Sequence, residues 1–174
     1  MYIPSLAAAA SDRSLTERNF PGGILRIEVF PEDDEIYILG NPPYLGSSLQ
    51  NISQKKDISS VFKDFNDFKN LDYISIWFYK AANYLRNFHS KCAFVTTNSV
   101  SQGEQVGLLW PKILIDGVEI GFAHNDFKWT NNAKGNAGVT VIIIGLGNTN
   151  NKIKKLINNN ISKQVKKINS YLIP

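Results

Sequence analysis

The sequence contains little cysteine, little histidine and no long hydrophobic run. Its one cysteine, Cys92, excludes an intrachain disulfide framework and is typical of a protein of the reducing cytoplasm. The longest apolar runs, residues 108–115 and 139–144, are far too short to cross a bilayer, so we expect no membrane partner. The two histidines lie far apart in the sequence, which argues against a metal site.

The composition otherwise describes a globular chain with a mildly basic balance. Of the 174 residues, 43% are hydrophobic and 20% are charged, and the net charge is +4. This is enough apolar material for one domain with a core, and the charge permits a polyanionic partner without requiring one. Residues 152–167 hold six lysines and no acid. On composition alone, residues 148–174 are predicted to be a solvated, poorly ordered Lys/Asn-rich tail rather than a phosphate-binding segment.

Periodic apolar segments predict alternating strands and helices. Asn70 or Asp72 is expected to cap the helix that follows them, and Pro111 is expected to break or kink a later helix. The alternation predicts an α/β sheet with crossover connections. The expected strands cover residues 24–30, 35–39, 92–96, 118–123 and 139–146, with 35–39 as a buried parallel strand, and the expected helices lie within 53–69 and over 71–86 and 102–115.

Three segments are expected at one edge of this sheet. In open α/β sheets the functional groups gather beyond the carboxyl ends of the strands. Residues 41–44, 97–101 and 124–129 each follow an expected strand. We therefore expect these three segments to lie close together.

The segment Asn41-Pro42-Pro43-Tyr44 carries the main functional signal. The exocyclic amine of a nucleobase is a poor nucleophile because its lone pair is delocalised into the ring, and acceptors that hold both N–H groups make the nitrogen more reactive. The Asn41 side-chain oxygen and the Pro42 carbonyl are two such acceptors. Pro43 stiffens the turn, and Tyr44 can stack on a flat base for about 1–3 kcal/mol. A proline turn that merely closes a strand is the alternative, and the position after an apolar strand favours the functional interpretation.

An Asn-Pro-Pro-Tyr segment after such a strand resembles the catalytic motif of the class I amino-methyltransferases that use S-adenosylmethionine. The chain is similar from about Asp34 to Leu146 to one branch of them, the adenine-N6 DNA methyltransferase region of the fused restriction–modification enzymes of the MmeI type. The stretches that carry the likeness are GNPPYLG at 40–46, NLDYISIWFYKAA at 70–82, AFVTTNSVSQGEQVGLLW at 93–110 and FAHNDFKW at 122–129.

The resemblance implies a role for several residues. Asn41 and Pro42 would bind the amino group of an adenine flipped out of double-stranded DNA, and Tyr44 would stack on its ring. Phe127 would sandwich the base from the other side, with Trp129 as the rival for that position. Residues 98–102 are expected to shape the pocket. Asp72 and Tyr73 begin the helix on the cofactor side and are carried over as S-adenosylmethionine contacts.

The chain departs from the family pattern on its cofactor side. No Gly-rich turn after a strand precedes Asn41, Gly22-Gly23 stands before a strand, and residues 145–148 are predicted to be a strand-terminating loop. The residues before Asn41 are too few for two βα units of about thirty residues each. We therefore expect a fragment with a partial Rossmann-like sheet: a ragged segment at 1–34, the catalytic half at 35–147, and a tail at 148–174 that leads toward an absent target-recognition region.

Three functions remain open at this point. The first is a DNA adenine-N6 methyltransferase of a restriction–modification system. The second is a methyltransferase that acts on RNA or on protein glutamine, which the 93–110 and 122–129 stretches argue against. The third is a non-catalytic remnant or subunit, which binds DNA or needs a separate chain that carries the cofactor-binding half.

Overall fold

A computed structural model describes residues 15–20, 23–28, 36–129, 139–159 and 161–174 of the chain. The chain forms two compact units, Met1–Asp34 and Glu35–Pro174. Within the first unit, β1 (Leu15–Phe20) and β2 (Gly23–Glu28) pair as an antiparallel hairpin. The strand expected over 24–30 is thus found as β2, and residues 29 and 30 lie outside the described part.

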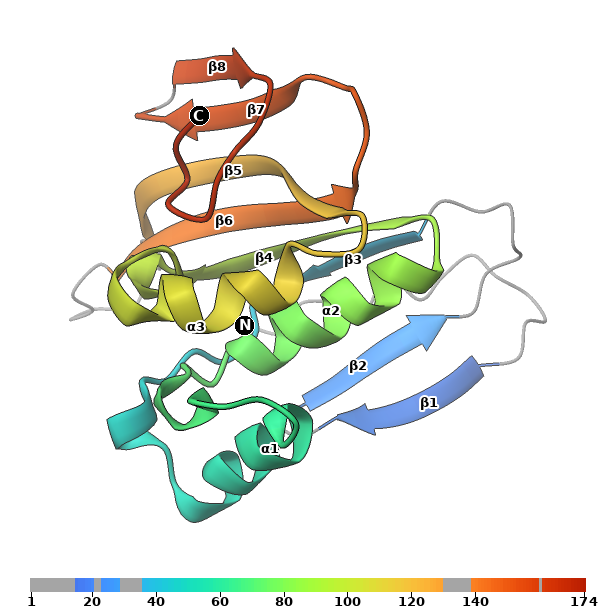
Figure 1. Cartoon of the computed structure of the whole chain (residues 1–174), viewed down its shortest axis with the longest axis vertical. Coiled ribbons are helices and arrows are strands. Elements are labelled where there is room, and N and C mark those ends of the chain that lie inside the picture. Colours follow the sequence, from blue (N-terminus) through green and yellow to red (C-terminus); the bar gives the residue numbers. More distant parts are fainter. Residues whose placement is uncertain (1–14, 21–22, 29–35, 130–138, 160) are drawn as a thin grey trace. The chain divides into compact units, whose positions relative to one another are not determined.

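A mixed six-stranded sheet forms the second unit (Figure 1). Its spatial order is β3-β4-β6-β5-β7-β8. The β3–β4 and β5–β7 pairs are parallel, and the other neighbours are antiparallel. The strands are β3 (Ile36–Gly40), β4 (Ser90–Thr97), β5 (Val118–Trp129), β6 (Val139–Asn148), β7 (Lys154–Asn158) and β8 (Ile161–Val165). One row of paired residues crosses all six strands: Gly40, Phe94, Ile144, Ala123, Leu156 and Lys163.

The helices of this unit connect its first strands. They are α1 (Ile52–Phe62), α2 (Ser75–Asn87) and α3 (Gly103–Ile113), with short 3-10 turns η1 (Ser47–Leu49), η2 (Phe68–Asn70) and η3 (Asn98–Ser101). Asn51 and Gln54 form a reciprocal capping box that starts α1. α2 and α3 lie side by side in front of the sheet in Figure 1. The expected α/β sheet with flanking helices is confirmed.

An aromatic cluster holds α2 and α3 on this face of the sheet. The Phe78 ring of α2 meets the Phe94 ring of β4 edge-on at 5.3 Å and the Trp110 ring of α3 at 5.6 Å. All three side chains are buried, and such pairs are worth about 0.5–1.5 kcal/mol each beyond the buried area. The Trp110 indole N–H donates to the Val100 carbonyl at 2.6 Å, so no polar atom of the ring is left unpaired. Cys92 of β4 is also buried in this core, and burial raises the pKa of its thiol to about 12.

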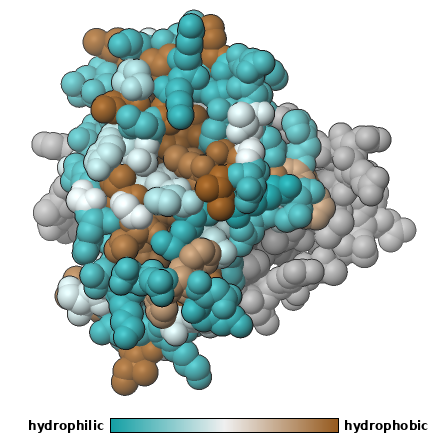
Figure 2. All heavy atoms as spheres, viewed as in Figure 1, coloured by the Kyte–Doolittle hydropathy of each residue, from teal (hydrophilic) through white to brown (hydrophobic). Residues whose placement is uncertain are grey.

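The opposite face of the sheet is accessible. Tyr37 and Leu39 of β3 are 59% and 72% exposed, and Val95, Phe122 and Ile143 are half-buried. The expected parallel strand at 35–39 is therefore confirmed in its direction but wrong in its burial. Only the side of β3 that carries Ile36 and Ile38 packs on the core. Figure 2 shows the other, helix-covered face, where hydrophilic side chains predominate over the outer surface.

Several expected boundaries differ from those of the structure. β5 runs on to Trp129 because its antiparallel pairing with β6 resumes after an irregularity between His124 and Phe127. The expected loop at 145–148 lies inside β6, because these residues pair with the start of β4. α3 continues through Pro111 to Ile113 rather than breaking there.

The prediction of a poorly ordered tail is wrong for the described residues after 148. Residues 154–165 supply β7 and β8, and Ile168 and Leu172 are buried in the core. Lys154 is 3% exposed, and its ammonium lies 2.5 Å from a Glu119 oxygen. It also donates to main-chain carbonyls of Asn150 and Lys152. The lysine-rich composition did not predict these strands. A lysine can be buried in a strand only when the fold supplies such acceptors, and composition does not show them.

None of the helices described is long and apolar enough to cross a membrane.

A pair of glycines on the accessible face allows a matched stability test. A Cβ atom at Gly145 would lie 2.2 Å from the Phe122 ring, whereas one at Gly147 would meet only Lys91 at 3.7 Å. We expect Gly145→Ala to lower the free energy of unfolding by about 1–3 kcal/mol. Gly147→Ala should be neutral or stabilising by up to about 1 kcal/mol. Urea unfolding of both variants measures this, and equal effects would contradict the assigned packing of Phe122.

Candidate functional site

The carboxyl ends of four strands share one edge of the sheet. β3, β4, β5 and β7 all run in the same direction, since β6 is antiparallel to both β4 and β5. Residues 41–44, 98–102 and 127–129 therefore lie along this edge, as the strand order predicts. We call it the carboxyl edge.

The loop after β3 presents two free acceptors at this edge. Asn41 is exposed, Pro42 is buried and Tyr44 is half-buried against the core. Neither the Asn41 side chain nor the Pro42 carbonyl makes a hydrogen bond with another described residue. No described peptide bond is cis. The Asn41 amide is thus exposed and unbonded among the described residues, while the Pro42 carbonyl belongs to a buried residue of the same stiff turn.

Phe127 lies at the same edge, and two strands separate its strand β5 from β3. The irregularity that precedes it in β5 is of the kind that redirects side chains near functional sites. Its ring packs edge-on against the His124 ring at 4.8 Å. The backbones of β3 and β5 are three strand spacings apart, or about 14 Å. This span has room for two aromatic side chains with a planar group between them. The backbone of Trp129 ends β5, but its side chain lies outside the described part.

Asp72 and Tyr73 lie beneath the loop, and both have protein partners. The Asp72 carboxylate is 6% exposed, and its Oδ1 accepts the N–H groups of Leu45 at 2.9 Å and Ile74 at 3.1 Å. The expected cap by Asn70 or Asp72 is not formed, because the N-cap of α2 is Ile74 and has no side-chain cap bond; Asp72 instead accepts the Ile74 N–H just before the helix. The buried Tyr73 hydroxyl donates to Asp57 Oδ2 at 2.8 Å. Burial, and then this bond to Asp57, raises the pKa of Tyr73 to about 12. Contact of either residue with a cofactor stays a prediction.

Two glutamines join this network without any signal in the sequence. Gln50 is 6% exposed and donates through Nε2 to the Leu45 and Leu71 carbonyls, both at 2.9 Å. Gln105 of α3 accepts the Asp72 N–H at 3.0 Å and donates to the Asn70 carbonyl at 2.7 Å. Gln50 lies in a polar loop and Gln105 on a helix, where a glutamine is unremarkable. Only the tertiary contacts distinguish them.

The loop after β4 forms a compact turn at the carboxyl edge. Thr97 and Ser99 share a hydroxyl hydrogen bond of 2.7 Å, and the Ser101 hydroxyl donates to the Asn98 carbonyl at 3.0 Å. The Trp110 indole holds the turn from the core side. This order is consistent with the expected pocket-shaping role.

The described strand-to-helix turns lack the Gly-rich pattern of Rossmann-type cofactor sites. Rossmann-type sites place closely spaced glycines in the turn between a strand and a helix. Neither strand-to-helix turn here, residues 41–51 after β3 and 98–102 after β4, has them. The described part of the chain likewise contains no cluster of three metal-binding side chains.

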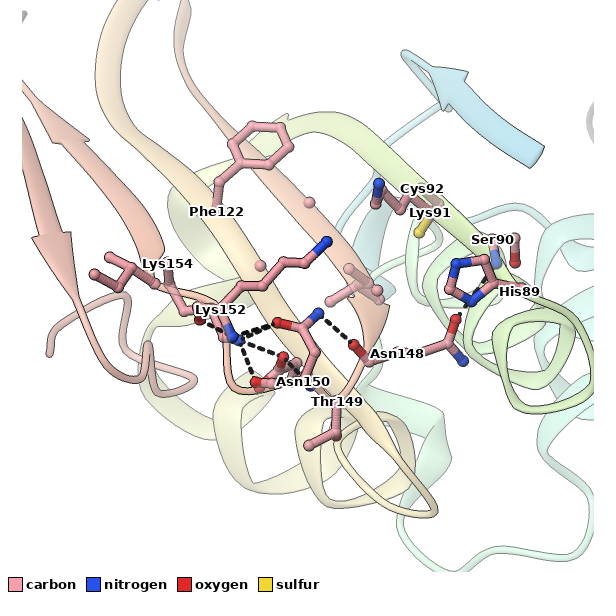
Figure 3. A pocket seen from close by; sticks show the side chains of 16 residues that line it. His89, Ser90, Lys91, Cys92, Phe122, Asn148, Thr149, Asn150, Lys152 and Lys154 are labelled. Atoms are coloured by element: carbon pink, nitrogen blue, oxygen red, sulfur yellow. Dashed lines mark hydrogen bonds and ion pairs between the residues drawn. The ribbon is translucent and has the colours of Figure 1, made fainter. Parts of the chain in front are cut away.

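A cavity of about 530 Å³ lies at the opposite edge of the sheet (Figure 3). Lys91 at the start of β4, Asn148 at the end of β6 and Lys152 line it. Figure 3 shows the Lys154 ammonium within a cluster of oxygen acceptors there. This cavity is therefore remote from Asn41, and the Lys154 ammonium beside it is fully hydrogen-bonded.

Comparison with known proteins identifies the family. The family model described as the MmeI DNA-methyltransferase domain matches residues 19–158. The chain belongs to the MmeI DNA-methyltransferase family. This match covers β3 to β7 and with them the whole carboxyl edge.

Two members of the MmeI family show how much of such proteins this chain represents. It is 49% identical over 140 residues to DNA methyltransferase A of Bacillus subtilis (strain 168), covering 80% of this chain and 16% of that protein. It is 43% identical, with a TM-score of 0.75, to the type IIL restriction–modification enzyme MmeI solved in complex with DNA. That likeness covers 79% of this chain and 19% of that one. The chain therefore spans less than a fifth of the length of either relative.

The Tyr73–Asp57 bond makes the free energy of unfolding depend on pH in the alkaline range. The pKa of Tyr73 is about 12 in the folded chain, against the ordinary tyrosine pKa of 10.0. Its contribution is therefore complete below pH 10 and is lost as pH rises toward 12. We expect Tyr73→Phe to lower the unfolding free energy by about 1 kcal/mol at neutral pH, and this deficit should shrink between pH 10 and 12. Denaturant unfolding across pH measures it. Tyr171→Phe, at an exposed tyrosine, is the control and should show neither effect.

Proposed function

We propose that this chain holds a flipped adenine of double-stranded DNA for methylation at N6, as part of a restriction–modification methyltransferase. The observation that carries the proposal is the exposed, unbonded Asn41 amide on a proline turn at the carboxyl edge, in a chain of the MmeI DNA-methyltransferase family. A base must leave the duplex before its amine can be reached. An edge with free acceptors and flanking aromatics meets that need.

Asn41 and Pro42 act on the amine by accepting hydrogen bonds from its two N–H groups. The Asn41 Oδ1 takes one N–H and the Pro42 carbonyl takes the other. The amine nitrogen then becomes more tetrahedral, and its lone pair is less delocalised into the ring. Because Pro42 and Pro43 restrict the backbone, the acceptors need little rearrangement when the base arrives.

Two aromatic side chains hold the base plane in this proposal. Tyr44 stacks on one face and Phe127 on the other, with Trp129 as the alternative partner. Each contact is worth about 1–3 kcal/mol. A sandwich of this kind fits a planar base and not the amide of a protein glutamine, so it favours a nucleic acid substrate.

S-adenosylmethionine would supply the electrophilic methyl group, and its site requires segments beyond the described residues. Parallel strands are almost always covered on both faces. Here the face with Leu39 and Val95, together with the outer edge of β3, stays accessible. We propose that the βα units of the cofactor-binding half dock on this face, either within a longer protein or from a separate chain. Without them the chain is a base-binding half that transfers no methyl group.

Recognition of the adenine amine can be tested on this chain directly. We expect it to bind a duplex with adenine opposite an abasic site at least about tenfold more tightly than the same duplex with purine, which lacks the amine. Asn41→Ala should abolish this preference because the acceptor is lost. Tyr44→Ala should weaken both duplexes about equally because stacking does not read the amine. Fluorescence anisotropy measures the affinities.

The control for this experiment is Ser48→Ala, which changes an exposed residue of the same loop region. It should retain the full preference for adenine. A wild-type chain that binds both duplexes equally would refute amine recognition. A preference that survives Asn41→Ala would refute the assignment of Asn41.

Duplex DNA also needs contacts beside the flipped base. Lys163 of β8 is exposed and lies in the same row of paired residues as Gly40. The row is five strand spacings long, or about 24 Å, and a duplex of about seven base pairs covers that span. We propose that Lys163 contacts a backbone phosphate on this flank.

The Lys163 contact predicts a change in salt dependence. We expect Lys163→Ala to lower duplex affinity uniformly across sequences and to reduce the slope of log affinity against log salt by about 1. Lys152→Ala is the matched control, because Lys152 is an exposed lysine beside the cavity at the opposite edge. Anisotropy titrations over a series of salt concentrations measure both slopes. Equal changes in the two variants would show that the duplex does not lie along the carboxyl edge.

A further inference from the structure

The 41–44 loop is held from one side by the residue that follows it. Leu45 has both backbone groups bonded to the start of α2: its N–H donates to Asp72 Oδ1 at 2.9 Å, and its carbonyl accepts the Tyr73 N–H at 3.0 Å. The Leu45 carbonyl also accepts from Gln50 at 2.9 Å. In the described chain, residues 41–44 make no backbone hydrogen bond outside helices and strands. These three bonds at Leu45 are therefore the hydrogen bonds nearest in sequence that anchor the end of the loop carrying Tyr44.

The side chains of Asp72 and Gln50 are buried, and one polar atom of each makes two hydrogen bonds. Asp72 Oδ1 accepts from Leu45 and from Ile74, and Gln50 Nε2 donates to the Leu45 and Leu71 carbonyls. The backbone N–H of Asp72 in turn donates to Gln105 of α3. The loop after β3 is thereby tied to both helices of the covered face.

We propose that Asp72 and Gln50 are positioning residues that hold Asn41 and Tyr44 in register for the base. Neither side chain needs to touch the substrate. A catalytic group displaced by about 1 Å loses roughly a hundredfold in rate, so a loop without internal hydrogen bonds needs an external support. The inference rests on the proposed function, because holding the loop in place matters for the base only if the loop binds it.

The chemistry of the arrangement separates this role from a cofactor contact. Asp72 acts here as a hydrogen-bond acceptor, and an asparagine Oδ1 can accept the same two N–H groups. A carboxylate that binds a ligand by its charge cannot be replaced in this way. Asp72→Asn should therefore preserve a positioning role, whereas Asp72→Ala leaves two buried N–H groups without an acceptor.

The test compares Asp72→Ala, Asp72→Asn and Gln50→Ala with the wild-type chain, and Asp64→Ala serves as a control at an exposed carboxylate. Two quantities are measured: hydrogen exchange of the Leu45 amide by NMR, and the ratio of adenine-duplex to purine-duplex affinity. In Asp72→Ala we expect Leu45 exchange to rise about tenfold or more and the affinity ratio to fall about tenfold. Gln50→Ala should lower the ratio in the same direction. Asp72→Asn and Asp64→Ala should match the wild type in both.

The outcomes separate this proposal from the proposed function. Unchanged Leu45 exchange in Asp72→Ala would overturn the positioning role, and so would an Asp72→Asn variant as impaired as Asp72→Ala. If the wild type shows no preference for adenine, the proposed function fails. Leu45 exchange in the variants then decides by itself whether Asp72 supports the loop. Exchange in β4 and β6 reports whether each variant is folded.

Discussion

Parallel pairing of β3 with β4 is the constraint on which the larger unit depends. Parallel neighbours cannot be joined by a hairpin, so the chain between Gly40 and Ser90 must cross over one face of the sheet. That crossover carries α1 and α2 and brings Phe78 against Phe94. It also sends both strands toward the same edge. Asn41 and Asn98, far apart in the sequence, begin the two loops that meet there.

The crossover leaves the two faces of the sheet unequal. One face carries the aromatic cluster around Phe78 and Trp110, whose side chains are buried. The other face leaves apolar side chains such as Leu39 accessible. In the described residues the core packs on one side of this mixed sheet, and the other side stays accessible. The bond from Leu45 to Asp72 joins the 41–44 loop to the start of α2 on the covered side.

Much of this arrangement could be predicted because the signals are local. Apolar periodicity predicted the helix over 71–86, and the short apolar run before Gly40 predicted a strand. The strands at 154–165 could not be predicted, since Lys154 is buried only through acceptors that come from Glu119 and the loop before it. The extension of β5 to Trp129 could not be predicted for a related reason, because its pairing with β6 stabilises it.

The sequence by itself determined the family, the proline turn with its Asn41 acceptor, and the alternation of strands and helices, because each depends on short stretches of neighbouring residues. Tertiary structure decided which polar side chains support that turn. Asp72, Gln50 and Gln105 acquire their roles from hydrogen bonds between segments separated by a whole helix or more. It also decided which face of β3 stays accessible, since burial depends on what packs against a strand and not on the strand alone.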